Sequence, residues 1–484
     1  MKISKKIAVS NLIWRFGERC GVQIVTFLVT IILARLLEPS DFGIVVNMSI
    51  VLNILGVFVD GGFSTALIQK KNADETDFSS VFWGQLFACG FLYIVLFVIS
   101  PVIANFFGNI ELTSMIRVLG ISLIVSSVKN VQVAYVTRNM IFRKFFFATI
   151  GGTLCSAIIG VIIAYLGGGP WAIIAQSLFN TTIDTIILWF IVKWRPQKKI
   201  SLKRIKELFS YGWKLLLSSL LDALYNNIRA LLIGKIYSSE DLAYYDHGDK
   251  WPNAIINSIN SSIDSILFPS MSSEQENLEN VKLITQKSIK TVSYIIFPLL
   301  IGIAFCGESL IKFCVTDKWL PALPFLVILC FYYALYPLHT ANLNAIKSIG
   351  RSDVYLKVEV FKKLFGFISI ICSLKFGPLA ICLSVLLSGI FSLVVNILPN
   401  KKLINYGLFE QFKDVLPNLL LSIFMGFVIF WFKYLTIPVA FIVILQLLTG
   451  FVIFIMGSLL FKLESLYFIL DIIKSWKCNN QTNN

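Results

Sequence analysis

Long apolar stretches recur along almost the whole of this 484-residue chain, and they constrain its fold more than any other feature. An α-helix needs about 20 predominantly apolar residues to cross a bilayer, and fourteen stretches of roughly that length can be marked. They lie near residues 12–37, 42–67, 79–104, 112–137, 145–167, 170–193, 209–236, 243–268, 286–311, 321–346, 357–376, 378–399, 415–435 and 437–461. The sequence therefore predicts an all-α polytopic membrane protein with about 14 transmembrane helices.

The composition excludes a water-soluble enzyme. Hydrophobic residues make up 57% of the chain and charged residues only 14%, with a mean hydropathy of +0.79. A soluble globular chain is nearer half apolar and a quarter charged. The first apolar stretch is too long for a cleavable signal peptide, and we expect it to remain as the first span.

The positive charge predicts the orientation of the chain. There are 42 Lys and Arg against 27 Asp and Glu, a formal net charge of +15. With the N-terminus in the cytoplasm, twenty-seven basic residues fall at cytoplasmic ends, and six fall outside: Arg35, Lys235, Lys312, Lys318, Lys375 and Lys433. Cytoplasmic loops carry such an excess of Lys and Arg, so both termini are predicted to be cytoplasmic and no nucleic-acid partner is needed to explain the charge.

Two short matches indicate an internal repeat. Residues 34–43 resemble residues 234–243, and both segments join the first span of a six-helix set to the second. Residues 169–173 (Gly-Pro-Trp-Ala-Ile) likewise match residues 377–381 (Gly-Pro-Leu-Ala-Ile). Because each set has an even number of spans, the two sets share one orientation, which is typical of transporters with parallel repeats.

The repeat divides the chain into four parts. We expect an N-terminal six-helix bundle over 1–194, a basic cytoplasmic linker over 195–208 and a C-terminal six-helix bundle over 209–400. Residues 401–484 are expected to hold two extra transmembrane helices and a cytoplasmic tail. A parallel-repeat transporter places its substrate path between the two bundles.

Polar residues form stripes on the first and seventh predicted helices. The first carries Asn11, Arg15, Arg19 and Gln23 at steps of four, with Glu18 beside them, and the seventh carries Lys214, Ser218, Asp222, Asn226 and then Arg229. Steps of four keep residues near one helical face. Charges within a span need a cavity or a partner, so we expect the two stripes to line a hydrated cavity. For Arg15 and Arg19 the alternative is that they extend to the lipid surface; for Asp222 and Arg229 it is a structural ion pair.

The eighth predicted helix is more polar still. Its row, at steps of three and four, consists of Asp246, Asp249, Lys250, Asn253, Asn257, Asn260, Ser261 and Asp264. Asp246 and Lys250 are one turn apart and can pair with each other, whereas Asp249 has no such obvious partner. Asp60 stands alone in the second helix and is either a cavity carboxylate or a solvated helix end. For His339 in the tenth helix, a hydrogen-bonded packing role is favoured over a proton relay.

The charges suggest a substrate class. Arg15, Arg19 and Lys214 cluster at the predicted cytoplasmic leaflet, and arginine suits bidentate contact with phosphate oxygens. We therefore predict that Arg15, Arg19, Lys214 and Arg229 bind a diphosphate head group. The residues predicted to line the cavity or couple to a cation are Glu18, Gln23, Asp60, Asp222, Asn226, Asp246, Asp249, Asn253, Asn257 and Asp264.

Cysteine usage gives no sign of a metal or cofactor. The nine cysteines are scattered singly, mostly in apolar stretches, without a CxxC pair. We interpret them as small core hydrophobes and expect no metal, cofactor or catalytic residue.

Several segments resemble the signature of bacterial polysaccharide flippases, the Wzx and WzxC-like proteins of the multidrug/oligosaccharidyl-lipid/polysaccharide exporter superfamily. They include residues 33–43 (Leu-Ala-Arg-Leu-Leu-Glu-Pro-Ser-Asp-Phe-Gly), 60–70 and 81–83 (Val-Phe-Trp). The resemblance continues through 138–144, 244–245, 251–252, 268–269, 318–322 and 345–353. It covers most of the first twelve predicted helices, whereas the last two match only in hydrophobicity.

The resemblance implies a flippase that moves a polyprenyl-diphosphate-linked oligosaccharide, an O-antigen, capsule or exopolysaccharide unit, from the cytoplasmic to the outer leaflet of the bacterial inner membrane. It implies that first-helix arginines such as Arg15 and Arg19 contact the diphosphate. The helices over 415–435 and 437–461 would then form a groove for the lipid tail. The implied partners are the lipid-linked oligosaccharide, membrane lipid and polysaccharide assembly proteins such as a polymerase or a chain-length regulator.

Two other functions compete with this one. A cation-coupled multidrug exporter of the same superfamily normally has twelve spans, and the arginine cluster would repel cationic drugs. A membrane-embedded glycan polymerase or ligase would need a large external loop with clustered Arg, His or Glu, and the predicted external connections are short. No GxxxxGK phosphate-binding loop occurs, so the energy would come from a gradient, from substrate consumption or from the membrane potential.

Overall fold

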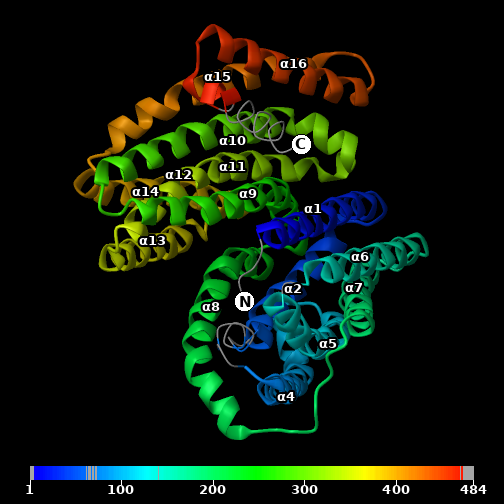
Figure 1. Cartoon of the computed structure of the whole chain (residues 1–484). Helices are drawn as coiled ribbons and strands as arrows, with labels where there is room; N and C mark the ends of the chain where they lie inside the picture. Colours follow the sequence, from blue (N-terminus) through cyan, green and yellow to red (C-terminus); the bar gives the residue numbers. More distant parts are fainter. Residues whose placement is uncertain are drawn as a thin grey trace. The chain divides into compact units, whose positions relative to one another are not determined.

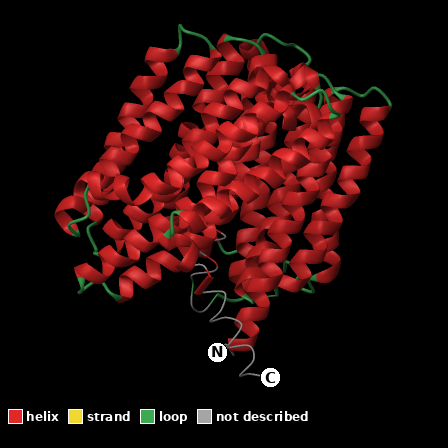
Figure 2. Ribbon diagram, turned by 90° about the horizontal axis from the view of Figure 1, so that it is seen from above, coloured by secondary structure: helices red, strands yellow, loops and turns green. Residues whose placement is uncertain are grey.

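The computed structural model of the chain describes residues 5–60, 63, 67, 70, 73–139, 141–468 and 470–471. Within these residues the chain consists of helices joined by connections, and no strand occurs (Figure 2). Helices satisfy all their backbone groups internally, as a chain in hydrocarbon must. The prediction of an all-helical chain is therefore confirmed for the described residues.

The helices follow the expected stretches closely. They are α1 (Lys5–Leu36), α2 (Pro39–Asp60), α4 (Glu75–Phe107), α5 (Leu112–Arg138), α6 (Phe142–Tyr165), α7 (Pro170–Ile191), α8 (Leu202–Ile236), α9 (Ser239–Ser273), α10 (Leu278–Cys314), η1 (Asp317–Ala322), α11 (Leu323–Ala334), α12 (Tyr336–Ser348), α13 (Ser352–Ser373), α14 (Pro378–Leu403), α15 (Leu408–Phe430), η2 (Trp431–Tyr434) and α16 (Val439–Leu460). The expected tenth span, 321–346, consists of two helices that meet at Leu335. Pro337 in the first turn of α12 lacks a backbone N–H, which explains a break at this point.

Among the described residues, eleven segments are long and apolar enough to cross a membrane. The other three expected spans, 209–236, 243–268 and 357–376, coincide with α8, α9 and α13. These helices are long enough to cross a membrane, but their polar and charged side chains make them less apolar than the eleven segments. The number of fourteen spans and the cytoplasmic position of the termini remain predictions.

The two matched sequence segments fold alike. The α1–α2 and α8–α9 connections both place two residues between the helices. In both, a hydrogen bond joins the last residue of the connection to the third residue of the next helix. The backbone N–H of Glu38 donates to Asp41 Oδ2 (3.2 Å) in the first, and the N–H of Asp241 donates to Ser238 Oγ (2.9 Å) in the second. Gly169 and Gly377 precede α7 and α14 with φ of 50° and 100°, a region that favours glycine. The repeat thus extends from sequence to local structure.

Residues Met1–Ala243 form one compact unit, here called the first unit. Its helices pack as the pairs α6 with α7, α4 with α5, α1 with α6 and α2 with α8. The repeated turns approach each other within it, because a Cβ built on Gly43 would lie only 1.6 Å from the carbonyl oxygen of Ser239. Only glycine permits this approach of α2 to the first turn of α9.

The basic linker is held on the first unit by several specific contacts. Just before the linker, Trp194 Nε1 donates to Glu75 Oε2 (2.7 Å), and within it the backbone N–H of Ser201 donates to Ser80 Oγ (3.0 Å). The Arg204 guanidinium pairs with Asp74 and, at 3.1 Å, with Asp77. Hydrogen bonding from Arg204 lowers the pKa of Asp74 from 3.8 to about 2. The linker is therefore fastened to the N-terminus of α4.

Residues Tyr244–Asn484 form the second unit. Here α15 and α16 pack on α10 (Figure 1). Lys290 of α10 pairs with Asp414 of α15 (3.2 Å) and with Glu464 beyond α16 (2.7 Å). Toward the other end of α10, Glu308 pairs with Lys433 (3.2 Å). The two extra helices are thus joined to the second unit by ion pairs at both ends.

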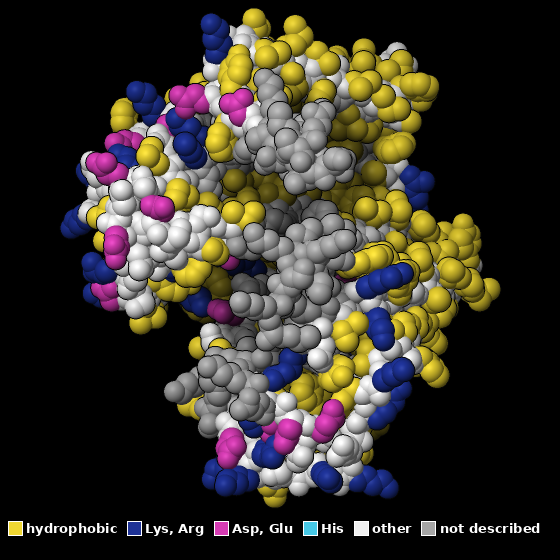
Figure 3. Space-filling model, viewed as in Figure 1, with side chains coloured by type: hydrophobic (Ala, Val, Ile, Leu, Met, Phe, Trp, Pro, Cys, Tyr) yellow, Lys and Arg dark blue, Asp and Glu magenta, His cyan; other side chains and the backbone are white. Residues whose placement is uncertain are grey.

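The outer surface of the extra helices is strongly apolar. Large hydrophobic side chains are exposed along them, and apolar side chains gather over α15 and α16 in the space-filling view (Figure 3). The most exposed ones include Phe409, Phe441, Phe451, Leu460 and Phe461. A soluble protein rarely shows such a continuous patch, which suits contact with lipid instead.

The two compact units divide the chain differently from the expected domains. Helix α8 packs with α2 and α4 inside the first unit, so the division by packing falls after Ala243 and not at the linker. The compact units reflect which helices contact one another, whereas the repeat reflects which segments of the sequence are similar. The division into 1–194, 195–208, 209–400 and 401–484 therefore remains a prediction about the repeat.

Candidate functional site

The basic stripe of α1 is described in part. Arg19 and Gln23 are exposed on this helix, whereas Glu18 is buried with 7% of its surface exposed. The side chains of Arg15 and Asn11 lie outside the described residues. The described part of the stripe therefore offers one guanidinium group, that of Arg19, on an exposed face.

The matching stripe of α8 presents both exposed and buried groups. Asp222 and Asn226 are exposed, and the side chain of Lys214 lies outside the described residues. Arg229 is only 8% exposed, and its Cζ lies 5.5 Å from the centroid of the Tyr225 ring. Arg229 Nε has no hydrogen-bond partner among the described residues.

Burying a guanidinium costs desolvation free energy, and a donor left without a partner, such as Arg229 Nε, adds to that cost. In a membrane helix such a group is more typical of a binding or transport site than of packing. Arg19 and Arg229 are carried by different helices, α1 and α8. Their convergence with Arg15 and Lys214 on one diphosphate remains a prediction.

The side chain of Asp60 lies outside the described residues. The preceding residue, Val59, has a backbone carbonyl that accepts two side-chain hydrogen bonds. Gln85 Nε2 of α4 (3.1 Å) and Asn130 Nδ2 of α5 (3.2 Å) both donate to that carbonyl. Neither amide was singled out from the sequence.

The polar row of α9 forms a chain of interactions. Lys250 pairs with Asp246 at 2.6 Å, as the one-turn spacing predicted. Asp249, for which the sequence offered no obvious partner, accepts hydrogen bonds from Tyr333 Oη (2.8 Å) and from Asn253 Nδ2 (3.0 Å). Asn253 Oδ1 in turn accepts from Asn257 Nδ2. The first half of the row is therefore linked internally and to α11.

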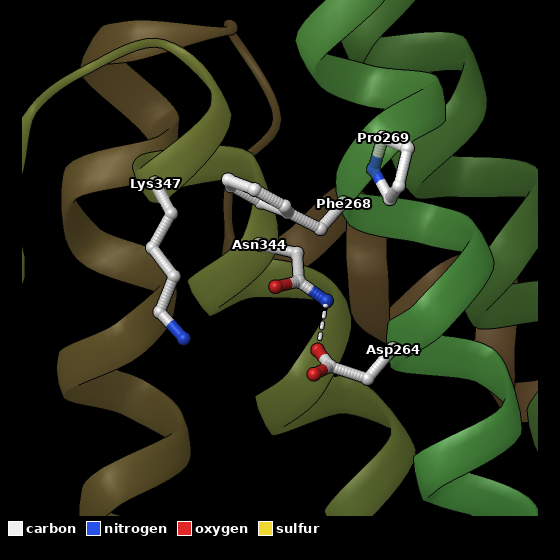
Figure 4. A pocket seen from close by; sticks show the side chains of 5 residues that line it. All are labelled: Asp264, Phe268, Pro269, Asn344 and Lys347. Carbon is white, nitrogen blue, oxygen red and sulfur yellow. Dashed lines mark hydrogen bonds between the residues drawn. The ribbon is translucent and has the colours of Figure 1, made fainter. Parts of the chain in front are cut away.

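The second half of the α9 row is linked to α12. Asn260 Oδ1 accepts from Thr340 Oγ1 (2.7 Å), and Asp264 Oδ1 accepts from Asn344 Nδ2 (2.7 Å). Beside the second bond lies a cavity of about 360 Å³, lined by Asp264, Phe268, Pro269, Asn344 and Lys347 (Figure 4). Phe268 and Pro269 follow Asp264 on α9, and Asn344 and Lys347 come from α12.

Two further polar clusters, each joining different helices, were not predicted from the sequence. Lys129 of α5 pairs with the buried Asp184 of α7 at 2.9 Å. Asn342 of α12 exchanges hydrogen bonds with Gln411 of α15 (2.9 and 2.8 Å) and accepts one from Asn400 of α14 (2.7 Å). The available signal was a set of isolated charges and amides of matching type within different apolar stretches.

His339 forms a side-chain hydrogen bond between helices, and half of the described cysteines are buried. His339 Nδ1 lies 2.9 Å from Asn396 Nδ2, the hydrogen-bonded arrangement that was favoured over a proton relay. The eight cysteines among the described residues are all free, and four are buried: Cys89, Cys306, Cys330 and Cys382. The described residues contain no cluster of His, Cys, Asp and Glu that could hold a metal ion.

Comparison with known sequences identifies the family. Residues 32–324, more than half of the chain, match the family described as "Polysaccharide biosynthesis protein". The teichuronic acid biosynthesis protein TuaB of Bacillus subtilis (strain 168) is 25% identical over 380 residues, covering 77% of this chain and 78% of that protein. The lipopolysaccharide biosynthesis protein WzxC of Escherichia coli (strain K12) is 20% identical over 367 residues, covering 75% and 74%.

Solved structures with the same fold are transporters. The lipid II flippase MurJ in an inward closed conformation matches with a TM-score of 0.73 at 18% identity, over 94% of this chain and 98% of that one. An inward-facing multidrug resistance MATE transporter matches with a TM-score of 0.60 at 14% identity, over 79% and 94%. At these identities the likeness shows the fold alone.

The family match confirms the resemblance predicted from the signature segments. Together with the eleven apolar helices, it shows a multi-pass membrane protein of polysaccharide biosynthesis. The chain belongs to the polysaccharide biosynthesis protein family.

Proposed function

We propose that the chain is a flippase that moves a polyprenyl-diphosphate-linked oligosaccharide from the cytoplasmic to the outer leaflet of the bacterial inner membrane. The oligosaccharide would be a repeat unit of O-antigen, capsule or exopolysaccharide. Relatives named for teichuronic acid, succinoglycan and lipopolysaccharide biosynthesis support the substrate class. Both termini are cytoplasmic in this proposal, and fourteen helices cross the membrane.

The observation that carries the proposal is the presence of α15 and α16, docked on α10. The lipid II flippase covers 94% of this chain, whereas the multidrug transporter in its inward-facing form covers 79%. A carrier of a lipid-linked substrate has a use for two additional helices whose outer surface is apolar. We propose that α15 and α16 form the groove that holds the polyprenyl tail, which a soluble drug would not need.

The head group is assigned to the basic side chains of α1 and α8. We propose that Arg15 and Arg19 of α1 bind the diphosphate with Lys214 and Arg229 of α8. Arginine is preferred for such contacts because its planar donors match phosphate oxygens in pairs. The buried Arg229, whose Nε has no hydrogen-bond partner among the described residues, supports this assignment.

Transport is proposed to follow alternating access, in which one six-helix bundle rocks against the other. The path is lined by Glu18, Gln23, Asp222, Asn226 and the α9 row. The carboxylates proposed to couple transport to a cation are Asp60, Asp222 and Asp249. Ion coupling predicts that flipping in vesicles responds to a proton or a sodium gradient, and indifference to both gradients would refute it.

Deletion of the gene in cells that carry it tests the function. Loss of a flippase should stop surface polysaccharide and cause its lipid-linked precursor to accumulate on the cytoplasmic side. The measurement is the amount of lipid-linked glycan in membrane extracts together with the amount of surface polysaccharide. Normal polysaccharide with increased drug sensitivity would instead support the multidrug exporter.

A further inference from the structure

The cavity at the end of α9 is distinct from the basic head-group residues and has chemistry of its own. It lies toward the C-terminal end of α9, and its lining residues come from α9 and α12. Earlier on α9, at Gly248, the helix approaches α11 closely, because a Cβ there would lie 2.8 Å from the backbone N of Leu326. Four turns later the Asp264 and Asn344 side chains form a hydrogen bond between α9 and α12. The cavity of about 360 Å³ lies beside this bridge.

Its walls combine hydrogen-bond acceptors, a donor and an aromatic ring. Asp264 Oδ1 accepts from Asn344 Nδ2 (2.7 Å), while Asp264 Oδ2 and Asn344 Oδ1 make no hydrogen bond to the described residues. Lys347 adds an ammonium group with three N–H donors, and its Nζ lies 4.8 Å from the centroid of the Tyr355 ring. Phe268 extends over Asn344 in the close view, and its side chain is 43% exposed (Figure 4).

This combination suits a carbohydrate. Sugar hydroxyl groups both donate and accept hydrogen bonds, so they match unused carboxylate and amide oxygens next to an ammonium group. An aromatic ring offers a flat apolar surface to the C–H face of a pyranose. The volume lies at the lower end of the range of small-molecule sites, about 300–1,000 Å³. Asn344 is only 2% exposed, so the polar wall is built into the helix packing and is not a mobile surface group.

The cavity also lies at the end where a substrate would enter. In the predicted orientation, the eighth and tenth spans both finish on the cytoplasmic side, near Phe268 and Lys347. A lipid-linked glycan is assembled in the cytoplasmic leaflet and presents its sugars to that side before transport.

We propose that the cavity lined by Asp264, Phe268, Asn344 and Lys347 is a saccharide subsite that binds a sugar of the lipid-linked glycan at loading. This proposal rests on the flippase function proposed above. Asp264 and Asn344 accept hydrogen bonds from sugar hydroxyls, Lys347 donates to sugar oxygens and Phe268 stacks on the ring. The subsite recognises the glycan, and the basic residues of α1 and α8 recognise the diphosphate.

The test uses the full-length chain in lipid nanodiscs and two probes. One probe is the lipid-linked glycan that accumulates in cells lacking the gene, and the other is undecaprenyl diphosphate, which carries no sugar. The wild type should bind both probes, and the glycan-bearing probe more tightly. Asp264→Ala and Phe268→Ala should each weaken binding of the glycan-bearing probe about tenfold and leave binding of undecaprenyl diphosphate within about twofold.

Matched control variants show whether weaker binding of the glycan-bearing probe comes from the cavity or from losing a charge or an aromatic ring anywhere on the protein. Glu276→Gln, in the connection after α9, and Phe376→Ala, between α13 and α14, change exposed side chains outside the cavity and should alter neither affinity. Melting temperatures of all variants show whether each one folds. Asp264→Asn, which keeps one acceptor oxygen, should bind the glycan-bearing probe with intermediate affinity.

Three results would overturn the subsite. They are equal affinity of the wild type for the two probes, unchanged affinity of the Asp264 and Phe268 variants for the glycan-bearing probe, and an equal loss of affinity for both probes. A wild type that binds neither probe, or cells that accumulate no lipid-linked glycan after gene deletion, would contradict the proposed flippase function instead. The two failures are therefore distinguishable.

Discussion

The polar row of α9 and the basic residues of α1 and α8 are all unusual for membrane helices, yet their surroundings differ. On α9, Asp249, Asn260 and Asp264 each hold a hydrogen bond to α11 or α12. On α8, the guanidinium of Arg229 is buried with an unsatisfied Nε, and on α1 Arg19 is exposed. One set of polar groups is used by the protein itself, and the other offers unused donors.

The difference teaches that polarity within a span has two separate causes. Hydrogen-bonded groups on α9 join that helix to α11 and α12. A buried cationic group with an unsatisfied donor, such as Arg229, costs stability, and we propose that its ligand is the diphosphate. Substitutions in the α9 row should therefore lower mainly the stability of the protein, and substitutions of the basic residues of α1 and α8 should lower mainly its transport.

The largest expected effect is on transport, from Arg19→Ala and Arg229→Ala. Each variant, and Arg15→Ala as predicted from the sequence, should abolish complementation of a flippase-null strain because the diphosphate loses a bidentate donor. Arg229→Ala should not lower the melting temperature, since it removes an incompletely satisfied buried charge. Cys20→Ala on α1 is the matched control and should complement fully. Full complementation by the Arg15→Ala/Arg19→Ala double variant would contradict the head-group assignment.

The next effect is on packing, from Gly248→Ala. The added methyl group would meet the backbone N of Leu326 at 2.8 Å, and backbone cannot move aside cheaply. Overpacking of this kind costs about 1–3 kcal/mol. Thermal unfolding of the purified variant measures the loss. Gly56→Ala on α2, where a Cβ would meet nothing within 4 Å, is the control, and an equal melting temperature for both variants would disprove the close approach.

Asp249→Ala should lower stability by a similar or smaller amount. It leaves Tyr333 Oη and Asn253 Nδ2 without their acceptor, and an unsatisfied buried group costs about 1–3 kcal/mol. Asp249→Asn keeps an acceptor oxygen and should recover most of the melting temperature. If Asp249→Ala melts at the wild-type temperature, the row does not position α9 as described.

The smallest expected effect belongs to Asp246→Asn. Asp246 and Lys250 form a partly exposed pair one turn apart, and such pairs contribute about 0.3–0.5 kcal/mol. The melting temperature should fall only slightly, and less in high salt because the pair is screened. A loss as large as that of Asp249→Ala would mean that the two halves of the row are not different in kind.

The sequence predicted the helices well because hydrophobic length and period are local properties. Every expected span falls on a helix, and the pairing of Asp246 with Lys250 follows from their spacing alone. The partners of Asp249 and Asp264 could not be predicted, since Tyr333 and Asn344 lie on helices about 80 positions away. The break at Leu335 was missed because Pro337 stands within an otherwise continuous apolar stretch.

For the candidate site, the sequence indicated which kinds of polar residue lie within apolar stretches, but not which residues of other helices they contact. Charges and amides within an apolar stretch pointed to the α9 row, because burying a polar group requires a partner or a cavity. The structure shows hydrogen bonds from this row to α11 and α12, and its role in transport stays a prediction. The Lys129–Asp184 pair and the contacts of Asn342 with α14 and α15 depend on which helices pack together. That information comes from tertiary structure, and no spacing along one helix reveals it.

The most direct test of the flippase function is transport by the purified chain in vesicles. Lipid-linked glycan placed in one leaflet should become accessible from the other side to a membrane-impermeant glycosidase much faster than in protein-free vesicles. Vesicles with Arg19→Ala or Arg229→Ala should behave as protein-free vesicles do. A wild-type chain that leaves the glycan in its starting leaflet at the protein-free rate would contradict the account.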